Sequence, residues 1–427
     1  MNTDAVRTIR PAGTVDACIR IPSSKSYTNR ALIVAALADG VSVIVRPSPS
    51  EDSEHVRKAL ESFCVPVTRG PGEDRIEISG TNGKLCAPRE EIFIGNAGTA
   101  MRFLTSLASI AGGTTTITGD ELMRKRPMAD LLDALRMAGV RCSSENGFPP
   151  VTVQGGHFVG GRIDIEGAVS SQFISSILLA APYAKRPVTL HVRGKLSSMP
   201  YVDMSIHVMR SFGALVDSID TANFRIDNQQ QYIGQEFTIE ADASGASYFF
   251  AAAAICGGRV LVAELSRESL QGDIRFLDIL EEMGCGVGER DNGIEVRGTG
   301  QLAGIEADMN DIPDCVPTLA VMAAFADGPT TIGNVAHLVH KESNRLRALA
   351  VELSKMGARV DVHEDGLTIT PKPMHGAAIE TYNDHRIAMS FAVAGLRQEG
   401  ISVRNPDCVA KSFPGFWDQF AQLEPKE

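Results

Sequence analysis

Basic side chains recur where helices are expected to begin in this chain. Lys25, Arg30, Arg102 and Arg386 lie in the strings SSKSYTNR, GNAGTAMR and NDHRIAM, which are rich in the Gly, Ser, Asn and Asp residues that cap helix N-termini. The first turn of a helix attracts anions through its backbone N–H groups and its dipole. A Lys or Arg in that turn adds a charged donor for phosphate or carboxylate. The pattern therefore predicts a cradle for small anions.

A module that the sequence repeats about six times positions these strings. In each copy an apolar stretch rich in small residues ends at a marker residue, and a short β-branched run follows at once. The markers stand 70 to 73 residues apart, at Gly40, Gly113, Arg186, Gly258, Gly328 and Gly400. Fifteen residues before the markers, at the expected start of each first helix, stand Lys25, Gly98, Ser171, Ala243, Pro313 and His385. Because repeated units present equivalent positions in similar geometry, chemistry concentrated at one position indicates a shared site.

A second polar set follows the markers by about thirteen residues, where an amphipathic second helix is expected to start. Its members are Arg126, Ser198, Tyr201, Lys341, Glu342 and Arg345. The second helices should end at Gly139, Gly213, Gly284 and Gly357, which suit a left-handed C-cap. The alternating runs RIEIS, RIDIE, GIEVRG and LTIT predict strands after them. The sixth copy is truncated and keeps only a terminal helix around Trp417 to Leu423. One capping string alone is explained by helix capping, but the coincidence of both sets at matching repeat positions favours a binding site.

Composition and charge exclude several classes of protein. The chain has 427 residues, enough for two domains, and 44% of them are hydrophobic, which excludes general disorder. The net charge of −11 argues against non-specific nucleic-acid binding. GNAGTAMR lacks the G-K-[ST] ending of a P-loop, so ATP chemistry is not expected. The apolar runs are too short to span a membrane.

Cysteine usage and the N-terminal sequence indicate the compartment. The eight cysteines are scattered singly without a C-x-x-C pair, which is typical of a reducing compartment and indicates no zinc site. Residues 1 to 20 contain no apolar signal core, so secretion is not expected. We therefore expect a cytoplasmic enzyme without a metal or cofactor and without a nucleic-acid or membrane partner. A monomer is also expected, although none of these features determines the oligomeric state.

Nine strings between about Pro22 and Phe416 resemble, in order, the motifs of the 5-enolpyruvylshikimate-3-phosphate synthase family. They are SKSYTNRAL, GNAGTAMRFL, RKRPMADLLDAL, SSQF, SMPYVD, IPD, KESNRL, YNDHRIAMS and AKSFPGFW. The resemblance implies transfer of the enolpyruvyl group of phosphoenolpyruvate to the 5-hydroxyl of shikimate 3-phosphate, with release of phosphate, on the shikimate pathway to chorismate and the aromatic amino acids. It also implies a two-domain inside-out α/β barrel built from six βαβαββ-type repeats, the enolpyruvyl transferase fold.

The family's domain organisation is carried over with its fold. The first domain, with three repeats, would span residues 21–240 as an insertion. The second domain, also with three repeats, would comprise residues 1–20 plus 241–427. The active site would lie in the cleft between the two domains.

The resemblance also assigns site residues, matched motif by motif. Shikimate 3-phosphate would contact Lys25, Ser26, Arg30, Ser170, Ser171, Gln172, Ser198, Tyr201, Asp314, His337 and Lys341. Phosphoenolpyruvate would contact Lys25, Asn96, Gly98, Arg126, Gln172, Glu342, Arg345, His385, Arg386 and Lys411. Asp314 would be the base near the 5-hydroxyl, and Glu342 would deliver a proton to the methylene carbon with Lys25 assisting. The missing Cβ of Gly98 would let backbone N–H groups approach an anion closely.

Four positions depart from the family pattern. Ser23 replaces a usual glycine, Phe103 a common proline and Asn344 a usual aspartate, while His337 stands where some members carry asparagine. Gly98, followed by Thr99-Ala100, matches the glyphosate-sensitive form of the family, and Phe103 bears on the placement of that helix. These departures concern the fine shape of the site and its inhibitor response more than the reaction.

Two other functions remain open at this point. A UDP-N-acetylglucosamine enolpyruvyl transferase shares the fold and the donor, but it typically uses a loop cysteine, and residues 113–126 contain none. A catalytically inactive anion-binding regulator would keep the fold, but retention of both Asp314 and Glu342 argues against it.

Overall fold

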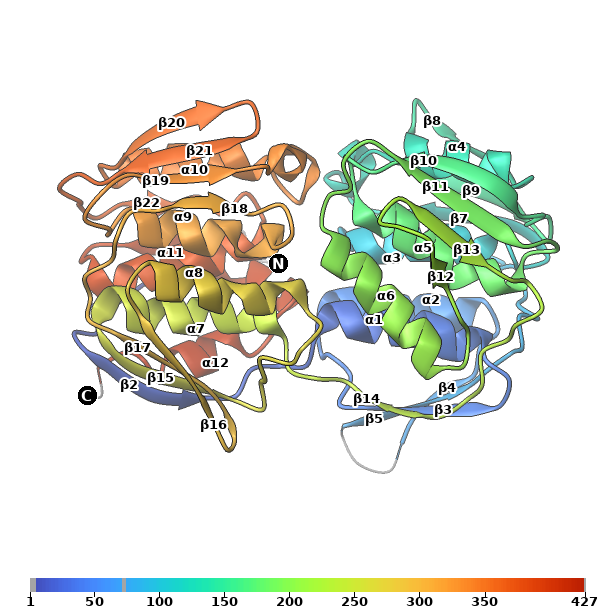
Figure 1. The fold of residues 1–427 in the computed structure, drawn as a ribbon, viewed down its shortest axis with the longest axis horizontal. Helices are drawn as coiled ribbons and strands as arrows, with labels where there is room; N and C mark the ends of the chain where they lie inside the picture. Colours follow the sequence, from blue (N-terminus) through green and yellow to red (C-terminus); the bar gives the residue numbers. More distant parts are fainter. Residues whose placement is uncertain (1–4, 71–73, 426–427) are drawn as a thin grey trace. The chain divides into compact units, whose positions relative to one another are not determined.

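The computed structural model describes residues 5–70 and 74–425 and divides the chain into two compact units. One unit is Ser23–Glu240, here called the inserted unit. The other joins the described parts of Met1–Pro22 and Ala241–Glu427 and is here called the terminal unit. Each unit has its own buried apolar cluster. The two units are coloured blue to green and yellow to red in Figure 1, apart from the blue N-terminal segment of the terminal unit.

The inserted unit contains three four-stranded sheets. Their orders are β14(Glu236–Thr238)-β3(Val41–Val45)-β5(Arg75–Ser79)-β4(Val67–Arg69), β6(Ile92–Phe93)-β7(Gly113–Thr118)-β9(Phe148–Gly155)-β8(Arg141–Glu145) and β10(Gly161–Glu166)-β11(Val188–Arg193)-β13(Asn223–Ile226)-β12(Asp217–Ser218). In every sheet the first pair is parallel and the later pairs are antiparallel. The sheets thus share one topology, as a repeated module requires.

The terminal unit repeats this topology. Its sheets are β2(Val15–Ile19)-β15(Gly258–Ala263)-β17(Gly293–Gly298)-β16(Gly286–Arg290), β18(Glu306–Asp308)-β19(Thr330–Gly333)-β21(Gly366–Thr370)-β20(Arg359–His363) and β22(Ala378–Ile379)-β23(Ser402–Arg404)-β1(Val6–Thr8). The last sheet corrects the expectation of a simply truncated sixth copy. Its antiparallel third strand, β1, comes from the N-terminal end of the chain.

Two strands are exchanged where the chain crosses between units. β2 precedes the helix that leads to β3, yet β2 pairs with β15; β14 precedes the helix that leads to β15, yet β14 pairs with β3. Each unit therefore completes one of its sheets with the strand that comes just before the chain leaves that unit.

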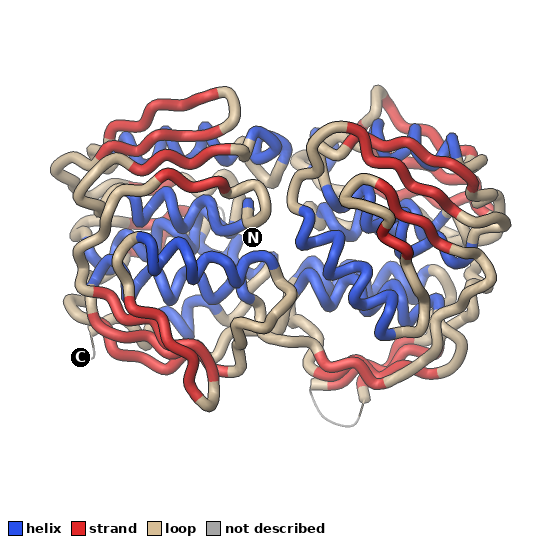
Figure 2. Tube along the Cα trace, in the orientation of Figure 1, coloured by secondary structure: helices blue, strands red, loops and turns tan. Residues whose placement is uncertain are grey.

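The first helices form the centre of each unit. They are α1(Lys25–Leu37), α3(Gly98–Ala108) and α5(Ser171–Ala180) in the inserted unit, and α7(Ala243–Cys256), α9(Val316–Ala323) and α11(His385–Arg397) in the terminal unit. These helices carry small and apolar side chains on all sides and can therefore be buried all round. Nearly every residue of α1, α7 and α11 is buried. The three helices of a unit pack against one another, with the strands outside them (Figure 2), which confirms the inside-out α/β arrangement.

The repeat spacing predicted the starts of the first helices correctly. Five begin at the marked residue, and the fifth copy opens with a 3₁₀ turn, η4(Pro313–Cys315), which α9 continues. The amphipathic second helices are α2(Glu51–Ser62), α4(Ala129–Met137), α6(Met199–Ser211), α8(Phe276–Glu282) and α10(Arg345–Lys355). Gly139, Gly213, Gly284 and Gly357 follow them at positive φ, as expected of left-handed caps.

Three expectations about helices need correction. Arg126 ends the 3₁₀ turn η1(Met123–Lys125) and lies before α4, because Pro127 follows it and the helix starts only at Ala129. Lys341 likewise ends the turn η5(Ala336–His340), and Lys341 and Glu342 lie in the loop before α10. The terminal helix, α12(Phe416–Phe420), is shorter than expected. The remaining 3₁₀ turns are η2(Ala181–Tyr183), η3(Gly272–Arg275) and η6(Pro406–Lys411).

Candidate active site

Lys25 opens α1 and is held by an ion pair. The Ser24 side chain caps the helix by accepting from the amide of Tyr27 at 3.3 Å. The Lys25 Nζ lies 3.0 Å from the Oδ2 of Asp52, and both side chains are buried. Asp52 stands in the first turn of α2. The pair fixes the ammonium group at the N-terminus of α1, where an anion would meet both the cation and the helix dipole.

Gly98, the first residue of α3, lies against the guanidinium of Arg126. A Cβ added at Gly98 would stand 2.6 Å from Nη1 and 2.7 Å from Cζ and Nη2 of Arg126. Arg102 links the start of α3 to the segment that follows Arg126, since its Nη1 donates to the Gly98 carbonyl at 3.1 Å and its Nη2 to the Pro127 carbonyl at 3.2 Å. The absence of a side chain at Gly98 is therefore what allows Arg126 to lie across the N-terminus of α3.

The starts of α5 and α6 complete the polar cluster of the inserted unit. Ser170 caps α5, and the Nε2 of Gln172 donates to the Oγ1 of Thr99 at 3.3 Å, which links α5 to α3. Ser198 is the N-cap of α6 and adopts a left-handed φ of 61°. Each of these groups therefore lies at the N-terminus of a first or second helix.

Arg30 ties α1 to α6 and is buried. Its Nε donates to the Oγ of Ser205 at 2.8 Å, its Nη1 to the Ser26 carbonyl at 2.9 Å and its Nη2 to the Tyr201 carbonyl at 2.8 Å. The ring of Phe103 lies 5.3 Å from its Cζ, within cation–π range. Burial lowers the pKa of Arg30 to about 10, so it stays charged at neutral pH. The unusual Phe103 is thus a buried partner of this arginine.

In the terminal unit three carboxylates surround the buried guanidinium of Arg345. Its Nη1 lies 3.2 Å from Asp314, its Nη2 2.8 Å from Glu342 and its Nε 2.9 Å from Asp384. A charge buried this deeply is tolerated because it is paired and hydrogen-bonded. The arrangement places the expected base, Asp314, and the expected acid, Glu342, on one cation.

Arg386, in the first turn of α11, binds the other oxygen of Asp314. Its Nη2 lies 2.5 Å from Oδ2 of Asp314 and 3.2 Å from the Oγ of Ser244, and its Nη1 donates to the Tyr248 hydroxyl at 3.2 Å. The Nζ of Lys411 lies 3.9 Å from Glu342. Arg345, Arg386 and Lys411, three of the cations expected to bind phosphoenolpyruvate, therefore lie beside carboxylates in this structure.

His385 and His337 are both buried in the terminal unit. His385 opens α11, with its Nδ1 3.7 Å from Oδ1 of Asp384. The Nε2 of His337 has no hydrogen-bond partner among the described residues. Burial, reinforced by the positive charge of Lys341 and partly opposed by Asp314, lowers the pKa of His337 to about 3. His337 is therefore a neutral imidazole at physiological pH.

The expected site residues divide into two sets, one in each unit, here called the two clusters. The inserted unit holds Lys25, Ser26, Arg30, Asn96, Gly98, Arg126, Ser170, Ser171, Gln172, Ser198 and Tyr201. The terminal unit holds Asp314, His337, Lys341, Glu342, Arg345, His385, Arg386 and Lys411.

The sequence analysis missed the carboxylates that hold these cations. Asp52 pairs with Lys25, and Asp384 pairs with Arg345 and caps α11 by accepting from the amide of Arg386 at 3.0 Å. Asp384 carried a usable signal, because an Asp directly before a helix start is a preferred N-cap. Asp52 carried none, since a first-turn carboxylate on an amphipathic helix is most simply read as solvent-exposed.

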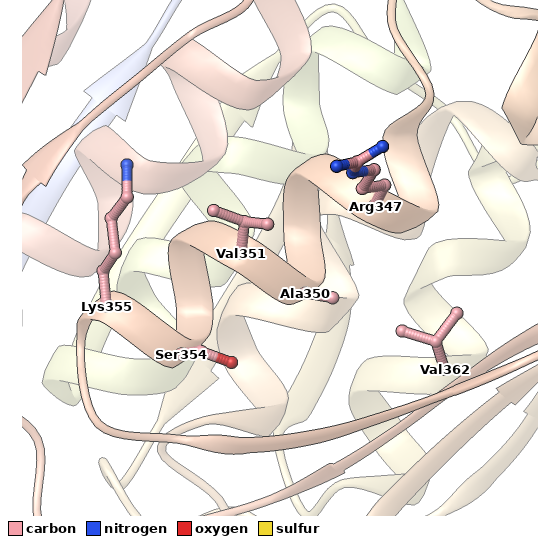
Figure 3. A pocket seen from close by; sticks show the side chains of 6 residues that line it. All are labelled: Arg347, Ala350, Val351, Ser354, Lys355 and Val362. Carbon is pink, nitrogen blue, oxygen red and sulfur yellow. The ribbon is translucent and has the colours of Figure 1, made fainter.

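One surface hollow lies in the terminal unit. It is lined by the outer face of α10 and by Val362 of β20 (Figure 3). None of its residues belongs to the expected site. Among residues 5–70 and 74–425, no group of three His, Cys, Asp or Glu side chains could hold a metal ion. Within the same ranges, no helix combines the length and apolar character that crossing a bilayer requires.

Comparisons with known proteins agree with the motifs and the fold. The family model described as EPSP synthase (3-phosphoshikimate 1-carboxyvinyltransferase) matches residues 9–420. The 3-phosphoshikimate 1-carboxyvinyltransferase of Trichormus variabilis is 45% identical over 96% of both chains, and that of Methanoculleus marisnigri is 46% identical over 96% of this chain and 97% of its own. A solved EPSP synthase structure from Acinetobacter baumannii is 29% identical, with a TM-score of 0.81 over 98% of each chain. The chain therefore belongs to the EPSP synthase family.

Proposed function

We propose that this chain is a 3-phosphoshikimate 1-carboxyvinyltransferase (EC 2.5.1.19) of the shikimate pathway. It transfers the enolpyruvyl group of phosphoenolpyruvate to the 5-hydroxyl of shikimate 3-phosphate and releases phosphate. Family membership over nearly the whole chain supports the activity. The observation that supports the residue roles is the guanidinium of Arg345, which binds both Asp314 and Glu342.

The reaction proceeds by addition and then elimination. Asp314 takes the proton of the 5-hydroxyl while the hydroxyl oxygen bonds to C2 of phosphoenolpyruvate. Glu342 delivers a proton to C3, which becomes a methyl group. In the tetrahedral intermediate the C2–O bond to phosphate then breaks, and a methyl proton leaves to restore the double bond. Phosphate departs with the electron pair of its C2–O bond, the methyl proton returns to the Glu342 carboxylate, and the proton held by Asp314 passes to the departing phosphate, so atoms and charge balance.

The ion pairs of the terminal unit suggest how substrate prepares these groups. Arg345 and Arg386 are engaged by carboxylates. An incoming phosphate or carboxylate competes for the same donors, because oppositely charged groups at close range attract strongly in a partly desolvated site. Anion binding would weaken the hold on Asp314 and Glu342 and make their oxygens available for proton transfer.

The anion-binding residues of the inserted unit are part of the proposal. Lys25 and Arg126 would supply cations at the starts of a first and a second helix, and Gly98 would leave room for an anion beside Arg126. The residues that the family motifs match to each substrate are divided between the two units. We therefore assign the substrates to residues of both units.

We also propose that the enzyme works as a cytoplasmic monomer, which size-exclusion chromatography with light scattering would test.

A phosphate-release assay tests the function. Phosphoenolpyruvate should release phosphate with shikimate 3-phosphate and not with UDP-N-acetylglucosamine. Asp314→Asn and Glu342→Gln should each reduce the rate at least about a hundredfold, since each removes a group that moves a proton. Phosphate release with the nucleotide sugar alone would favour the other transferase, and release with neither acceptor would favour a binding protein.

A further inference from the structure

The segment 380–384 joins β22 to α11 and holds two consecutive residues in an unusual conformation. Tyr382 has a φ of 54° and Asn383 a φ of 55°. The amide of Asp384 donates to the Thr381 carbonyl at 2.8 Å, so residues 381–384 form a hydrogen-bonded turn with both central residues left-handed. Such a turn favours Gly, Asn or Asp at its centre, and a bulky tyrosine there is strained.

This turn leads directly into site residues. Asp384 caps α11 and binds Arg345, and His385 and Arg386 form the first turn of the helix. A shift of the turn would therefore move the cap and, with it, the two side chains expected to contact phosphoenolpyruvate. A strained element at such a place persists only when its surroundings hold it.

Glu352 supplies that hold. Its carboxylate is completely buried in the third turn of α10. The Tyr382 hydroxyl donates to its Oε1 at 2.6 Å, and the Glu380 amide donates to its Oε2 at 3.1 Å. The Nζ of Lys355 lies 2.8 Å from both oxygens. Desolvation and the bond to Glu352 raise the pKa of the Tyr382 phenol above its usual range, so it remains a donor.

α10 therefore contacts the segment at two points. Arg345, its first residue, binds Asp384 at the end of the turn, and Glu352, two turns later, binds the side chain and backbone at its beginning. Of the residues on the outer face of α10 labelled in Figure 3, Lys355 contributes through its ion pair with Glu352. The complete burial of Glu352 and its three partners distinguish it from a surface glutamate that faces solvent.

We propose that Glu352 is a positioning residue for the phosphoenolpyruvate half of the reaction. Through Tyr382 it holds the strained turn that places His385 and Arg386, without touching substrate itself. The inference rests on the proposed function and adds a residue to it.

Kinetics of paired variants test this role. Glu352→Gln keeps the shape and removes the charge, and Tyr382→Phe removes only the donor. Each should raise the KM for phosphoenolpyruvate about tenfold, the value of one hydrogen bond to a charged group, while the KM for shikimate 3-phosphate stays within about threefold. Tyr183→Phe is the matched control. It removes a phenol that bonds the Leu37 carbonyl in the inserted unit, and it should change neither KM.

A rescue separates positioning from a general loss of stability. Asn tolerates a left-handed φ, so Tyr382→Asn in the Glu352→Gln background should keep the turn in place without the hydrogen bonds to Glu352, here called the clamp. The KM for phosphoenolpyruvate should then return most of the way to the wild-type value. A phosphoenolpyruvate KM within twofold of wild type in both single variants would overturn the proposal. So would parallel losses for both substrates in proportion to the unfolded fraction, or no recovery in the double variant.

Hydrogen exchange gives a readout that does not depend on activity. In Glu352→Gln, peptides covering residues 380–386 should exchange faster than in wild type, because the Glu380 amide loses its charged acceptor. Unchanged exchange there would contradict the clamp even if the wild-type enzyme proved to have another activity. Failure of wild type to transfer enolpyruvate would instead refute the proposed function.

Discussion

Gly98→Ala tests whether the contact between Gly98 and Arg126 serves binding rather than folding. The added Cβ would lie 2.6 Å from Nη1 of Arg126, and ordinary contact begins at 3.4 Å, so the guanidinium must move by about 0.8 Å. Because the guanidinium ends a flexible side chain, it can move without unfolding α3. The substitution should therefore displace the Arg126 guanidinium and weaken its contact with phosphoenolpyruvate, while the fold stays intact.

The expected effect is large for one substrate. Loss of a hydrogen bond to a charged group costs about 1.5–3 kcal/mol, which corresponds to a ~10–150-fold higher KM for phosphoenolpyruvate. Stability should be unchanged or higher by up to ~1 kcal/mol, because Ala favours the helix that begins at this residue. The assay is initial rate against phosphoenolpyruvate at saturating shikimate 3-phosphate, with thermal unfolding measured in parallel.

Gly245→Ala is the matched control. It lies in the first turn of α7, the equivalent helix of the fourth repeat, where the nearest atoms to an added Cβ are 3.7 Å away. This variant should bind phosphoenolpyruvate as wild type does. The reasoning is refuted if Gly98→Ala leaves that KM within twofold of wild type, or if the control shows the same rise.

Four further outcomes are expected. Lys25→Ala should lower turnover at least about a hundredfold with the fold intact, since it removes a charged donor aimed at substrate; near-normal phosphate release would contradict its role. Arg345→Met should lose about 3–5 kcal/mol in urea unfolding, because it removes the buried cation that three carboxylates share; a loss below about 1 kcal/mol would show that their other partners suffice. Burial holds the pKa of His337 at about 3 in the folded chain, so between pH 6.5 and 3 only the unfolded chain takes up this proton. The free energy of unfolding therefore decreases as the pH is lowered through that window. His337→Asn should therefore lose about 2 kcal/mol less than wild type between pH 8 and 5, and parallel curves would disprove the shift. EDTA should not change the rate, and a loss restored by a divalent ion would reveal a metal requirement.

The sequence predicted local structure well where one periodic signal controlled it. Repeat spacing placed the first residues of α1, α3, α5, α7 and α11, because small apolar helices and β-branched strands alternate at nearly constant intervals. It placed Arg126 and Lys341 less well, since 3₁₀ turns lengthen the loops before the second helices. Neither the exchange of β2 and β14 nor the pairing of β1 with β23 was predicted. Strand pairing across hundreds of residues leaves no local pattern.

The candidate site was predicted in its cations more fully than in its carboxylates. Motifs identified Arg345 and Arg386, but Asp52 and Glu352 become visible only through their buried contacts. A glutamate on an amphipathic helix has the same local pattern whether it faces solvent or a turn from a distant segment. Such partners have to be read from the structure.

The reaction run in D₂O tests the central claim most directly. Addition followed by elimination passes through a methyl group that gains a solvent deuteron, and that group then loses either a proton or the deuteron. We predict phosphate release by ³¹P NMR together with deuterium in the enolpyruvyl methylene of the product, seen by mass spectrometry. Phosphate released with pyruvate as the only carbon product, or a transferred group without deuterium, would contradict enolpyruvyl transfer by this chain through a tetrahedral intermediate.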